Sequence, residues 1–250
     1  MERHAGAYIM RHTVTPPMFI IGHRGARAVA PENTLRALEV GMACADYVEV
    51  DVRLSRDGVP VIMHDATLDR TTDGSGPICA YLLSELKVLD AGDGERVPTL
   101  QEVVSRVSGR RGLCVEVKEE GSEEIVCRVL KGYDPEKLFV VSFHKGSIEK
   151  VKILLPGVRT GFIYSRDGGD PLSTATSVRA DVVLPEKDLL TSALVERAHR
   201  CGLMVVPWVL NADNEVLAAW DVGADGIVSD DPCRMSVLLT GVEKTRRREW

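Results

Sequence analysis

Residues 48–65 read VEVDVRLSRDGVPVIMHD, and the fold prediction starts from this stretch. Glu49 and Asp51 alternate with valines, so a β-strand would point both carboxylates to one face and the valines to the other. Two like charges on one face of a buried strand repel each other, and their desolvation is costly. A hard divalent cation would compensate them, because it prefers carboxylate oxygens as ligands.

The same stretch then reverses direction and brings a histidine back. Arg56–Gly58 predicts a turn, and Val59–Met63 predicts a second strand that forms a hairpin with the first. His64 and Asp65 follow that second strand directly. The hairpin therefore returns a possible general acid or base to the end of the strand that carries the carboxylates.

Strand and helix patterns alternate along the rest of the chain. Eight apolar runs are predicted as strands, with approximate centres at Phe19, Val48, Val115, Val140, Gly161, Val182, Val205 and Ile227. A helical pattern follows each run, which implies a parallel sheet. Eight such units in 250 residues are typical of an α/β protein with the (β/α)8 or TIM-barrel fold. A doubly wound open sheet is the alternative, but no G-x-G-x-x-G follows the first strand.

The barrel is expected to form a single domain over residues 18–242. Residues 66–97 interrupt the alternation with two turn-rich segments and one short helical pattern at Ser84–Leu89. We expect this segment to be a small insertion after the hairpin, near the active-site face. Residues 1–17 predict a flexible leader rather than a secretory signal, and the charged residues 243–250 predict a frayed tail.

Composition narrows the classes of partner. An apolar content of 44 % and a charged content of 27 % are ordinary for a globular protein. A net charge of −6 gives no reason to expect nucleic-acid binding, and no apolar run is long enough to predict stable membrane insertion. The six cysteines contain no C-x-x-C pair and are interpreted as small buried hydrophobic residues. Without a secretory signal, the cytoplasm is the expected location.

Polar side chains follow several predicted strands. In a (β/α)8 barrel the carboxyl ends of the strands form the active site. The polar residues and the tryptophan at these ends are His23, Arg24, Glu49, Asp51, His64, Glu116, Lys118, Ser142, His144, Trp208 and Asn211. A lone histidine or acidic pair at a strand end is usually structural. Their recurrence at one end of successive strands favours a functional site.

The acidic residues and histidines in this set indicate metal and acid–base chemistry. Glu49, Asp51 and Glu116 offer only oxygen ligands, which suits Mg²⁺ or Ca²⁺ and argues against zinc. His23 and His64 suit one general acid and one general base.

Two cations complete the predicted set. Arg24 and Lys118, together with the metal, suit a phosphate ester anion as the ligand. Lys118 could instead neutralise Glu116 as a structural ion pair. His144 could contact the substrate or be a surface residue. The sequence leaves both questions open.

A series of motifs runs from residue 22 to residue 232. In chain order they are Gly22–Gly25, Pro31–Thr34, Val48–Val52, Val61–Asp65, Thr67–Thr72, Val97–Leu100 with Glu102, Glu116–Lys118, Trp208–Asn211 and Gly226–Pro232. In composition and order this series resembles the glycerophosphodiester phosphodiesterase family, metal-dependent enzymes of the phospholipase-C-like TIM-barrel superfamily. The resemblance covers nearly the whole chain.

The resemblance implies metal-dependent hydrolysis of a glycerophosphodiester to sn-glycerol 3-phosphate and an alcohol. The matching positions assign the acid and base to His23 and His64, the metal to Glu49, Asp51 and Glu116, the phosphate to Arg24 and Lys118, and the glycerol side to Trp208. Asn33, Asp65 and Asn211 also belong to the motifs and are expected to support these groups. Glu32 could bind the metal or orient His23 or Arg24.

Several alternatives stay open at this point. Either histidine could be the acid, and the nucleophile could be the glycerol 2-hydroxyl or a metal-bound water. The sequence does not specify which small-molecule diester is the substrate, which head group it carries, or the oligomeric state. A second reading is lysophospholipase D-type cleavage on the same scaffold, for which Ile78–Leu89 is the candidate apolar contact, although burial of that segment is the simpler explanation. A non-catalytic binder would lack a histidine or a carboxylate, and none is missing.

Overall fold

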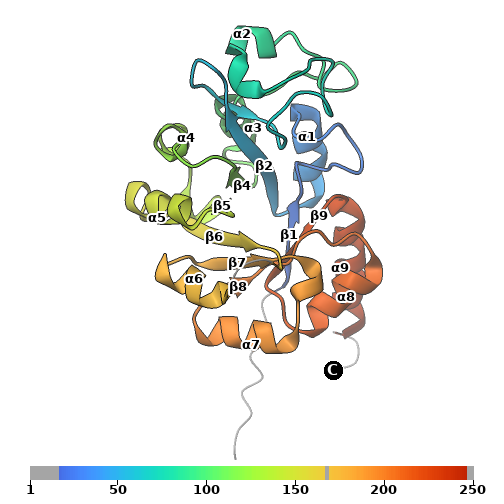
Figure 1. The fold of residues 1–250 in the computed structure, drawn as a ribbon. Helices are drawn as coiled ribbons and strands as arrows, with labels where there is room; N and C mark the ends of the chain where they lie inside the picture. The colour runs from blue at the N-terminus through green and yellow to red at the C-terminus, as the bar shows by residue number, and fades with distance from the viewer. Residues whose placement is uncertain (1–16, 167–168, 247–250) are drawn as a thin grey trace, which may run out of the picture.

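The computed structural model describes residues 17–166 and 169–246 (Figure 1). Its strands are β1 (Phe19–Gly22), β2 (Tyr47–Leu54), β3 (Pro60–Ile62), β4 (Gly112–Val117), β5 (Leu138–Ser142), β6 (Arg159–Tyr164), β7 (Val182–Pro185), β8 (Met204–Val205) and β9 (Gly226–Ser229). Its α-helices are α1 (Leu35–Cys44), α2 (Leu83–Leu86), α3 (Leu100–Val107), α4 (Glu123–Leu130), α5 (Lys145–Leu154), α6 (Pro171–Ser177), α7 (Ser192–Arg200), α8 (Asp213–Asp221) and α9 (Pro232–Arg246). The leader expected at residues 1–17 lies outside the described residues except for Pro17.

Eight parallel strands form a nearly closed barrel. Their order is β8-β7-β6-β5-β4-β2-β1-β9, and β3 pairs antiparallel with β2. Backbone hydrogen bonds cross the seam between β8 and β9, from Asp225 N to Val205 O (2.9 Å), from Val228 N to Pro207 O (3.0 Å) and from Leu210 N to Val228 O (2.9 Å). The predicted (β/α)8 fold and its hairpin at β2 and β3 are confirmed.

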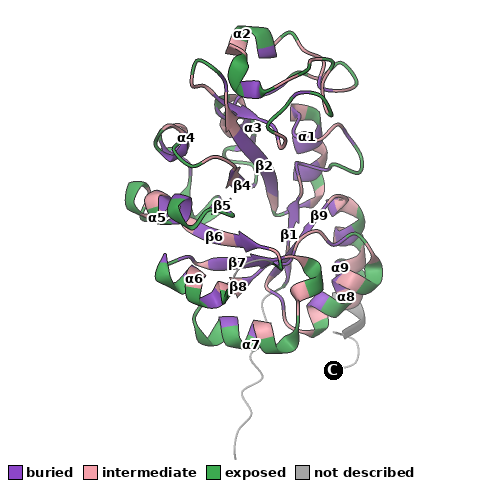
Figure 2. Ribbon diagram, in the orientation of Figure 1, coloured by how far each residue is buried: buried purple, intermediate pink, exposed green. Residues whose placement is uncertain are grey.

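Side-chain alternation along the strands divides the core into two layers. Val48, Val50 and Val52 point away from the barrel axis and are fully buried against Leu38 of α1 and Leu100 of α3. A second cluster fills the barrel interior with Ile21, Cys114, Phe139, Val141, Ile163, Val182, Leu184, Val206 and Val228. In Figure 2 the strands are mostly buried, while the helices expose their outer faces. Full burial of one such side chain stabilises the fold by about 1.5–3 kcal/mol.

The N-termini of α1 and α3 lie directly after threonines that cap them. Thr34 caps α1 and accepts a hydrogen bond from Ala37 N (3.2 Å). Thr99 caps α3 together with Glu102, whose carboxylate accepts from Thr99 N (2.7 Å). α9 continues to Arg246, into the segment expected to be frayed, because Glu, Lys and Arg favour helix.

Residues 66–97 pack beside the hairpin and carry a small core of their own. This segment contains a 3-10 turn at Ile78–Ala80 and the helix α2, which lies beyond the end of β2 in Figure 1. Ile78 and Leu86 are buried in a cluster with Val61 and Met63 of the hairpin region. The segment therefore reaches the C-terminal end of β2 through apolar contacts.

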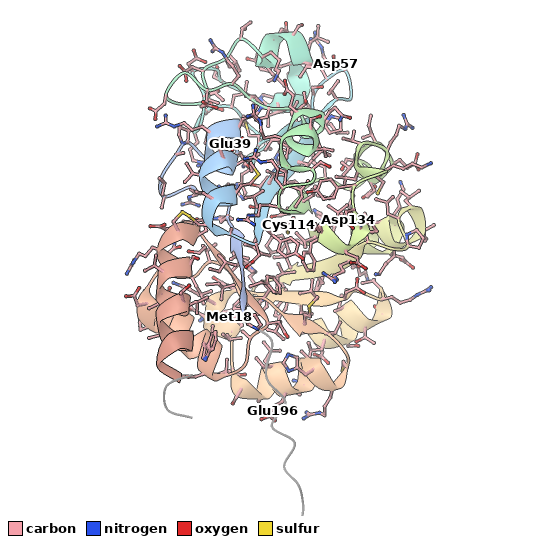
Figure 3. The ribbon with its side chains drawn as sticks, turned by 180° about the vertical axis from the view of Figure 1, so that it is seen from behind. Met18, Glu39, Asp57, Cys114, Asp134 and Glu196 are labelled. Carbon is pink, nitrogen blue, oxygen red and sulfur yellow. A yellow bond between two sulfur atoms is a disulfide. The ribbon has the colours of Figure 1, made fainter. Side chains whose placement is uncertain are left out.

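The cysteines depart from the sequence interpretation. Cys114 and Cys127 are buried as expected, whereas Cys79 and Cys201 are exposed. Cys44 and Cys233 form a disulfide between the end of α1 and the start of α9 (Figure 3, sulfur in yellow). The two cysteines are 189 positions apart, so only closure of the barrel brings their Cα atoms to 4.8 Å. No helix within residues 17–166 and 169–246 is long and apolar enough to span a membrane.

Candidate active site

A pocket of about 230 Å³ opens at the carboxyl ends of the strands. Its polar wall consists of His23, Arg24, Arg27, Glu49, His64, Glu116 and Lys118. Its other wall consists of Cys114, Val141, Phe143, Ile163, Leu184, Trp208, Val209 and Val228. Charged and apolar side chains thus line the same pocket at the mouth of the barrel.

The turn after β1 positions Arg24 through left-handed backbone. Arg24 has a φ of 49° and Gly25 a φ of 86°. A Cβ atom on Gly25 would lie 2.5 Å from the carbonyl carbon of Ala37, so the turn requires glycine there. Arg24 N donates to Glu49 Oε2 (2.7 Å), and its Nη1 donates to Glu32 Oε1 (2.6 Å). The turn therefore directs both the backbone amide and the guanidinium of Arg24 to carboxylates of the site.

Three carboxylates converge from two neighbouring strands. Glu49 and Asp51 lie on β2, and Glu116 lies on β4 beside Asp51. One ligand oxygen from each lies within 4.8 Å of the other two. Asn33 Nδ2 donates to Asp51 Oδ2 (2.9 Å), and Asp51 Oδ1 has Lys118 Nζ as a charged neighbour at 3.3 Å. The buried atom Glu49 Oε1 has no hydrogen-bond partner, and an unpaired buried carboxylate oxygen fits a hard divalent cation, which supplies the missing partner.

The charges of this cluster are only partly balanced by the protein. Burial and the charges of Asp51 and Glu116 raise the pKa of Glu49, and burial with the charge of Asp51 raises the pKa of Glu116 to about 7. Burial opposes ionisation of Asp51, but Lys118 and Arg24 outweigh it and lower its pKa. Lys118 Nζ lies 2.7 Å from Glu116 Oε1 and 3.3 Å from Asp51 Oδ1. Lys118 thus pairs with Glu116 and also lines the pocket.

Each histidine of the pocket is hydrogen-bonded to its own aspartate. His23 Nδ1 lies 2.6 Å from Asp230 Oδ1, and His64 Nδ1 lies 2.6 Å from Asp65 Oδ1. An ionised carboxylate only accepts hydrogen bonds, so each Nδ1 carries a proton and each Nε2 is left for chemistry. Burial lowers the pKa of His64 more than the charge of Asp51 raises it.

Asp230 is a site residue that the sequence prediction missed. Asn211 Nδ2 donates to its Oδ2 (2.9 Å), and Asn211 Oδ1 accepts from Asp230 N (2.9 Å) and Ser229 Oγ (3.1 Å). Asn211 therefore supports Asp230, which in turn orients His23. Asp230 directly follows β9, and this strand-end position was the available signal.

An aromatic pair forms part of the apolar wall. Trp208 Nε1 donates to Leu184 O (2.9 Å), and its ring lies edge-on to Phe143 at 5.7 Å. Phe143, also missed from the sequence, lines the pocket. The neighbouring His144 does not line it, and its Nδ1 lies 3.9 Å from Glu120 Oε2 at the surface.

Glu32 lies beside Arg24 rather than in the carboxylate cluster. Both of its oxygens accept hydrogen bonds from arginines, Arg24 and Arg70. Of the roles that the sequence left open, orientation of Arg24 is the one this geometry favours. The structure brings the residues given a metal, acid–base, phosphate or supporting role to the same end of the barrel, at the pocket or one to two contacts behind it. His144, the open candidate, lies at the surface instead.

Cations, two histidines and a carboxylate cluster that could hold a metal ion meet at one pocket, an arrangement that suits a phosphate ester and is typical of a (β/α)8-barrel phosphodiesterase. Comparison with known proteins agrees with this class. The model of the glycerophosphoryl diester phosphodiesterase family matches residues 23–234, and the chain belongs to that family. The chain is accordingly an enzyme that hydrolyses phosphoric diesters.

Individual relatives match over most of their length. A glycerophosphodiester phosphodiesterase of Caldanaerobacter subterraneus subsp. tengcongensis is 34 % identical over 231 residues, which cover 85 % of this chain and 94 % of the relative. A phosphodiesterase of Oleispira antarctica, solved with its product sn-glycerol 3-phosphate, has a TM-score of 0.83 and 32 % identity and covers 90 % of this chain and 97 % of its own. A glycerophosphodiester phosphodiesterase of Agrobacterium tumefaciens has a TM-score of 0.78 and 28 % identity, over 88 % and 99 % of the two chains.

Proposed function

We propose that the enzyme hydrolyses glycerophosphodiesters to sn-glycerol 3-phosphate and an alcohol, with a divalent cation and two acid–base histidines. The observation that carries the proposal is the convergence on one pocket of three carboxylates and two aspartate-backed histidines. The Oleispira relative, whose product is sn-glycerol 3-phosphate, supports the choice of substrate class.

Glu49, Asp51 and Glu116 would hold the cation, and their all-oxygen donor set suits Mg²⁺ or Ca²⁺. When bound, the cation supplies positive charge that stabilises the developing negative charge on the phosphoryl oxygens. Arg24 and Lys118 line the same pocket and add donors for those oxygens. The phosphodiester is thereby neutralised and held close to the histidines.

His23 and His64 share the proton transfers. One Nε2 accepts the proton of the attacking hydroxyl, from the glycerol 2-position or from water, and the other donates a proton to the leaving alkoxide. Asp230 and Asp65 stabilise the imidazolium that forms on each ring and keep its Nε2 directed to the pocket. With the glycerol hydroxyl as nucleophile, a cyclic phosphate forms first and water then opens it.

Trp208 and Phe143 form the apolar side of the pocket, suited to the carbon face of the glycerol unit. The indole N–H is already bonded to Leu184 O, so the ring offers the pocket its face and edge rather than a donor. In the candidate segment Ile78–Leu89 only part of the apolar surface is available to a lysophospholipid, because Val88 is exposed but most of the large apolar side chains pack inward. Ile78 and Leu86 of the candidate segment are buried, and Leu83 packs against the same cluster.

Product release from purified protein tests the proposal. We would measure sn-glycerol 3-phosphate from glycerophosphocholine, glycerophosphoethanolamine and a lysophospholipid, each with Mg²⁺, with Ca²⁺ and with chelator. Metal-dependent turnover of the two water-soluble diesters is expected. Turnover of the lysophospholipid alone would contradict the substrate class, and full activity in chelator would contradict the cation.

A further inference from the structure

Arg70 is the residue of segment 66–97 that reaches the supports of two different groups of the pocket. Its Nε and Nη2 donate to Asp65 Oδ2 (2.7 Å) and Oδ1 (3.0 Å). Its Nη1 and Nη2 donate to Glu32 Oε2 (2.9 Å) and Oε1 (2.8 Å). Four of the five N–H donors of one guanidinium thus bind two carboxylates, each in a bidentate manner.

Each of these carboxylates has its second partner inside the pocket. Asp65 Oδ1 bonds to His64 Nδ1 (2.6 Å), and Glu32 Oε1 accepts from Arg24 Nη1 (2.6 Å). A continuous chain of charge-assisted hydrogen bonds therefore runs from His64 through Asp65, Arg70 and Glu32 to Arg24. Arg70 itself does not line the pocket and has 47 % of its side chain exposed, so it acts on the substrate only through its two partners.

The geometry requires an arginine. A lysine ammonium is a compact charge that cannot form both bidentate contacts at once. The hydrogen bonds from Arg70 also hold the pKa of Asp65 below its usual range, which keeps an acceptor available to His64.

We propose that Arg70 is a positioning residue that couples the seating of segment 66–97 to the orientation of both His64 and Arg24. The inference rests on the proposed function of those two residues. It assigns to the segment a role in setting the geometry of proton transfer and phosphate binding together.

The test is a kinetic comparison of Arg70→Met with wild type, with Arg96→Ala as the matched control. Arg96 is an exposed arginine of the same segment that bonds to the backbone oxygen of Val88 (3.0 Å), away from the pocket. We expect Arg70→Met to lower kcat by about 10–100-fold and to raise KM, the range found for residues that orient a reacting group. Arg70→Lys should restore only part of the loss, and Arg96→Ala should match wild type.

A second comparison separates positioning from general stability. In an Asp65→Asn/Glu32→Gln background the partners of Arg70 are already altered, so adding Arg70→Met should cost less than about threefold in kcat. Melting temperatures would be recorded for every variant. A purely structural role would instead give the full additional loss in that background, and this result would overturn the inference.

The outcome also separates this inference from the proposed function. If His64→Ala is strongly impaired while Arg70→Met turns over like Arg96→Ala, the role of His64 stands and the inference about Arg70 falls. If His64→Ala retains wild-type kcat, the proposed acid–base role of His64 falls instead.

Discussion

Replacing Asp230 by asparagine should give His23 the wrong tautomer. In the wild-type protein Asp230 accepts from His23 Nδ1 on one oxygen and from Asn211 Nδ2 on the other. The side-chain amide of Asn211 cannot flip, because its Oδ1 already accepts a hydrogen bond from the backbone N–H of residue 230. The new amide must therefore present its oxygen to Asn211 and its NH₂ group to His23. His23 Nδ1 then accepts, the proton moves to Nε2, and the lone pair at the pocket is lost.

The magnitude follows from the bond to His23. Loss of a charge-assisted hydrogen bond of 2.6 Å at a largely buried carboxylate costs about 1.5–3 kcal/mol. At about 1.4 kcal/mol for each factor of ten, Asp230→Asn should lower kcat by about 10–10²-fold. Asp231→Asn is the matched control, because the carboxylate of Asp231 accepts from Arg234 N (3.0 Å) at the start of α9 rather than from His23.

A swap of the two side chains provides the sharper assay. In Asp230→Asn/Asn211→Asp, the carboxylate at position 211 accepts from the amide NH₂ at position 230. The amide oxygen then faces His23 Nδ1, and the original tautomer returns. We expect the swap to recover at least about tenfold of the lost kcat. The ¹⁵N chemical shifts of the His23 ring would report the tautomer directly in each variant.

Two results would refute this reasoning. One is near-wild-type kcat for a folded Asp230→Asn protein, which would mean that the orientation of His23 does not limit turnover. The other is an Nδ1-protonated His23 in that variant, which would mean that Asn211 does not control the amide.

Three further predictions concern acid–base chemistry, the metal and stability. His64→Ala should lower kcat by at least about 10²-fold and leave the metal affinity unchanged, as measured by turnover and by calorimetric titration. A kcat equal to that of wild type would exclude His64 from proton transfer. Burial and the charge of Asp51 raise the pKa of Glu116 to about 7, and the pKa of Glu49 is raised as well, so below pH 7 a cation must displace at least one proton. Its affinity should then fall by at least about tenfold per pH unit, and calorimetry that finds a constant affinity below pH 7 would contradict this. The disulfide closes a loop of 189 residues, for which the chain-entropy relation gives a stabilisation of about 5 kcal/mol. Cys44→Ser/Cys233→Ser should therefore lower the free energy of unfolding, measured in urea, by about 3–5 kcal/mol. An unchanged urea midpoint would contradict the pairing.

Local patterns carried most of the fold prediction. The hairpin of β2 and β3 follows from alternating residues on either side of a glycine turn. Glu49, Asp51 and Glu116 could be brought together from sequence because parallel strands end at one face of a barrel. These predictions need only strand periodicity and a fold that fixes which strand ends meet.

Contacts between residues that are far apart in the sequence could not be predicted from local patterns. The pairing of Cys44 with Cys233 depends on where α1 and α9 meet, and no local spacing encodes that meeting. Arg70 and Glu32 are 38 positions apart and lie on two loops whose paths no periodic pattern defines. The cytoplasmic location likewise stays a prediction.

The two histidines depend on different levels of the fold. His64 and Asp65 are chain neighbours on the hairpin, so their contact requires only β2, β3 and the adjoining segment. His23 and Asp230 are 207 positions apart, and they meet because β1 pairs with β9. The seam beside β9 is closed by backbone bonds rather than by a further pair of strands, as at Val228 N to Pro207 O. Loosening of that seam should therefore disturb His23 before His64. The proposed chemistry thus needs the whole barrel, although the hairpin alone supplies one residue of the proposed acid–base pair.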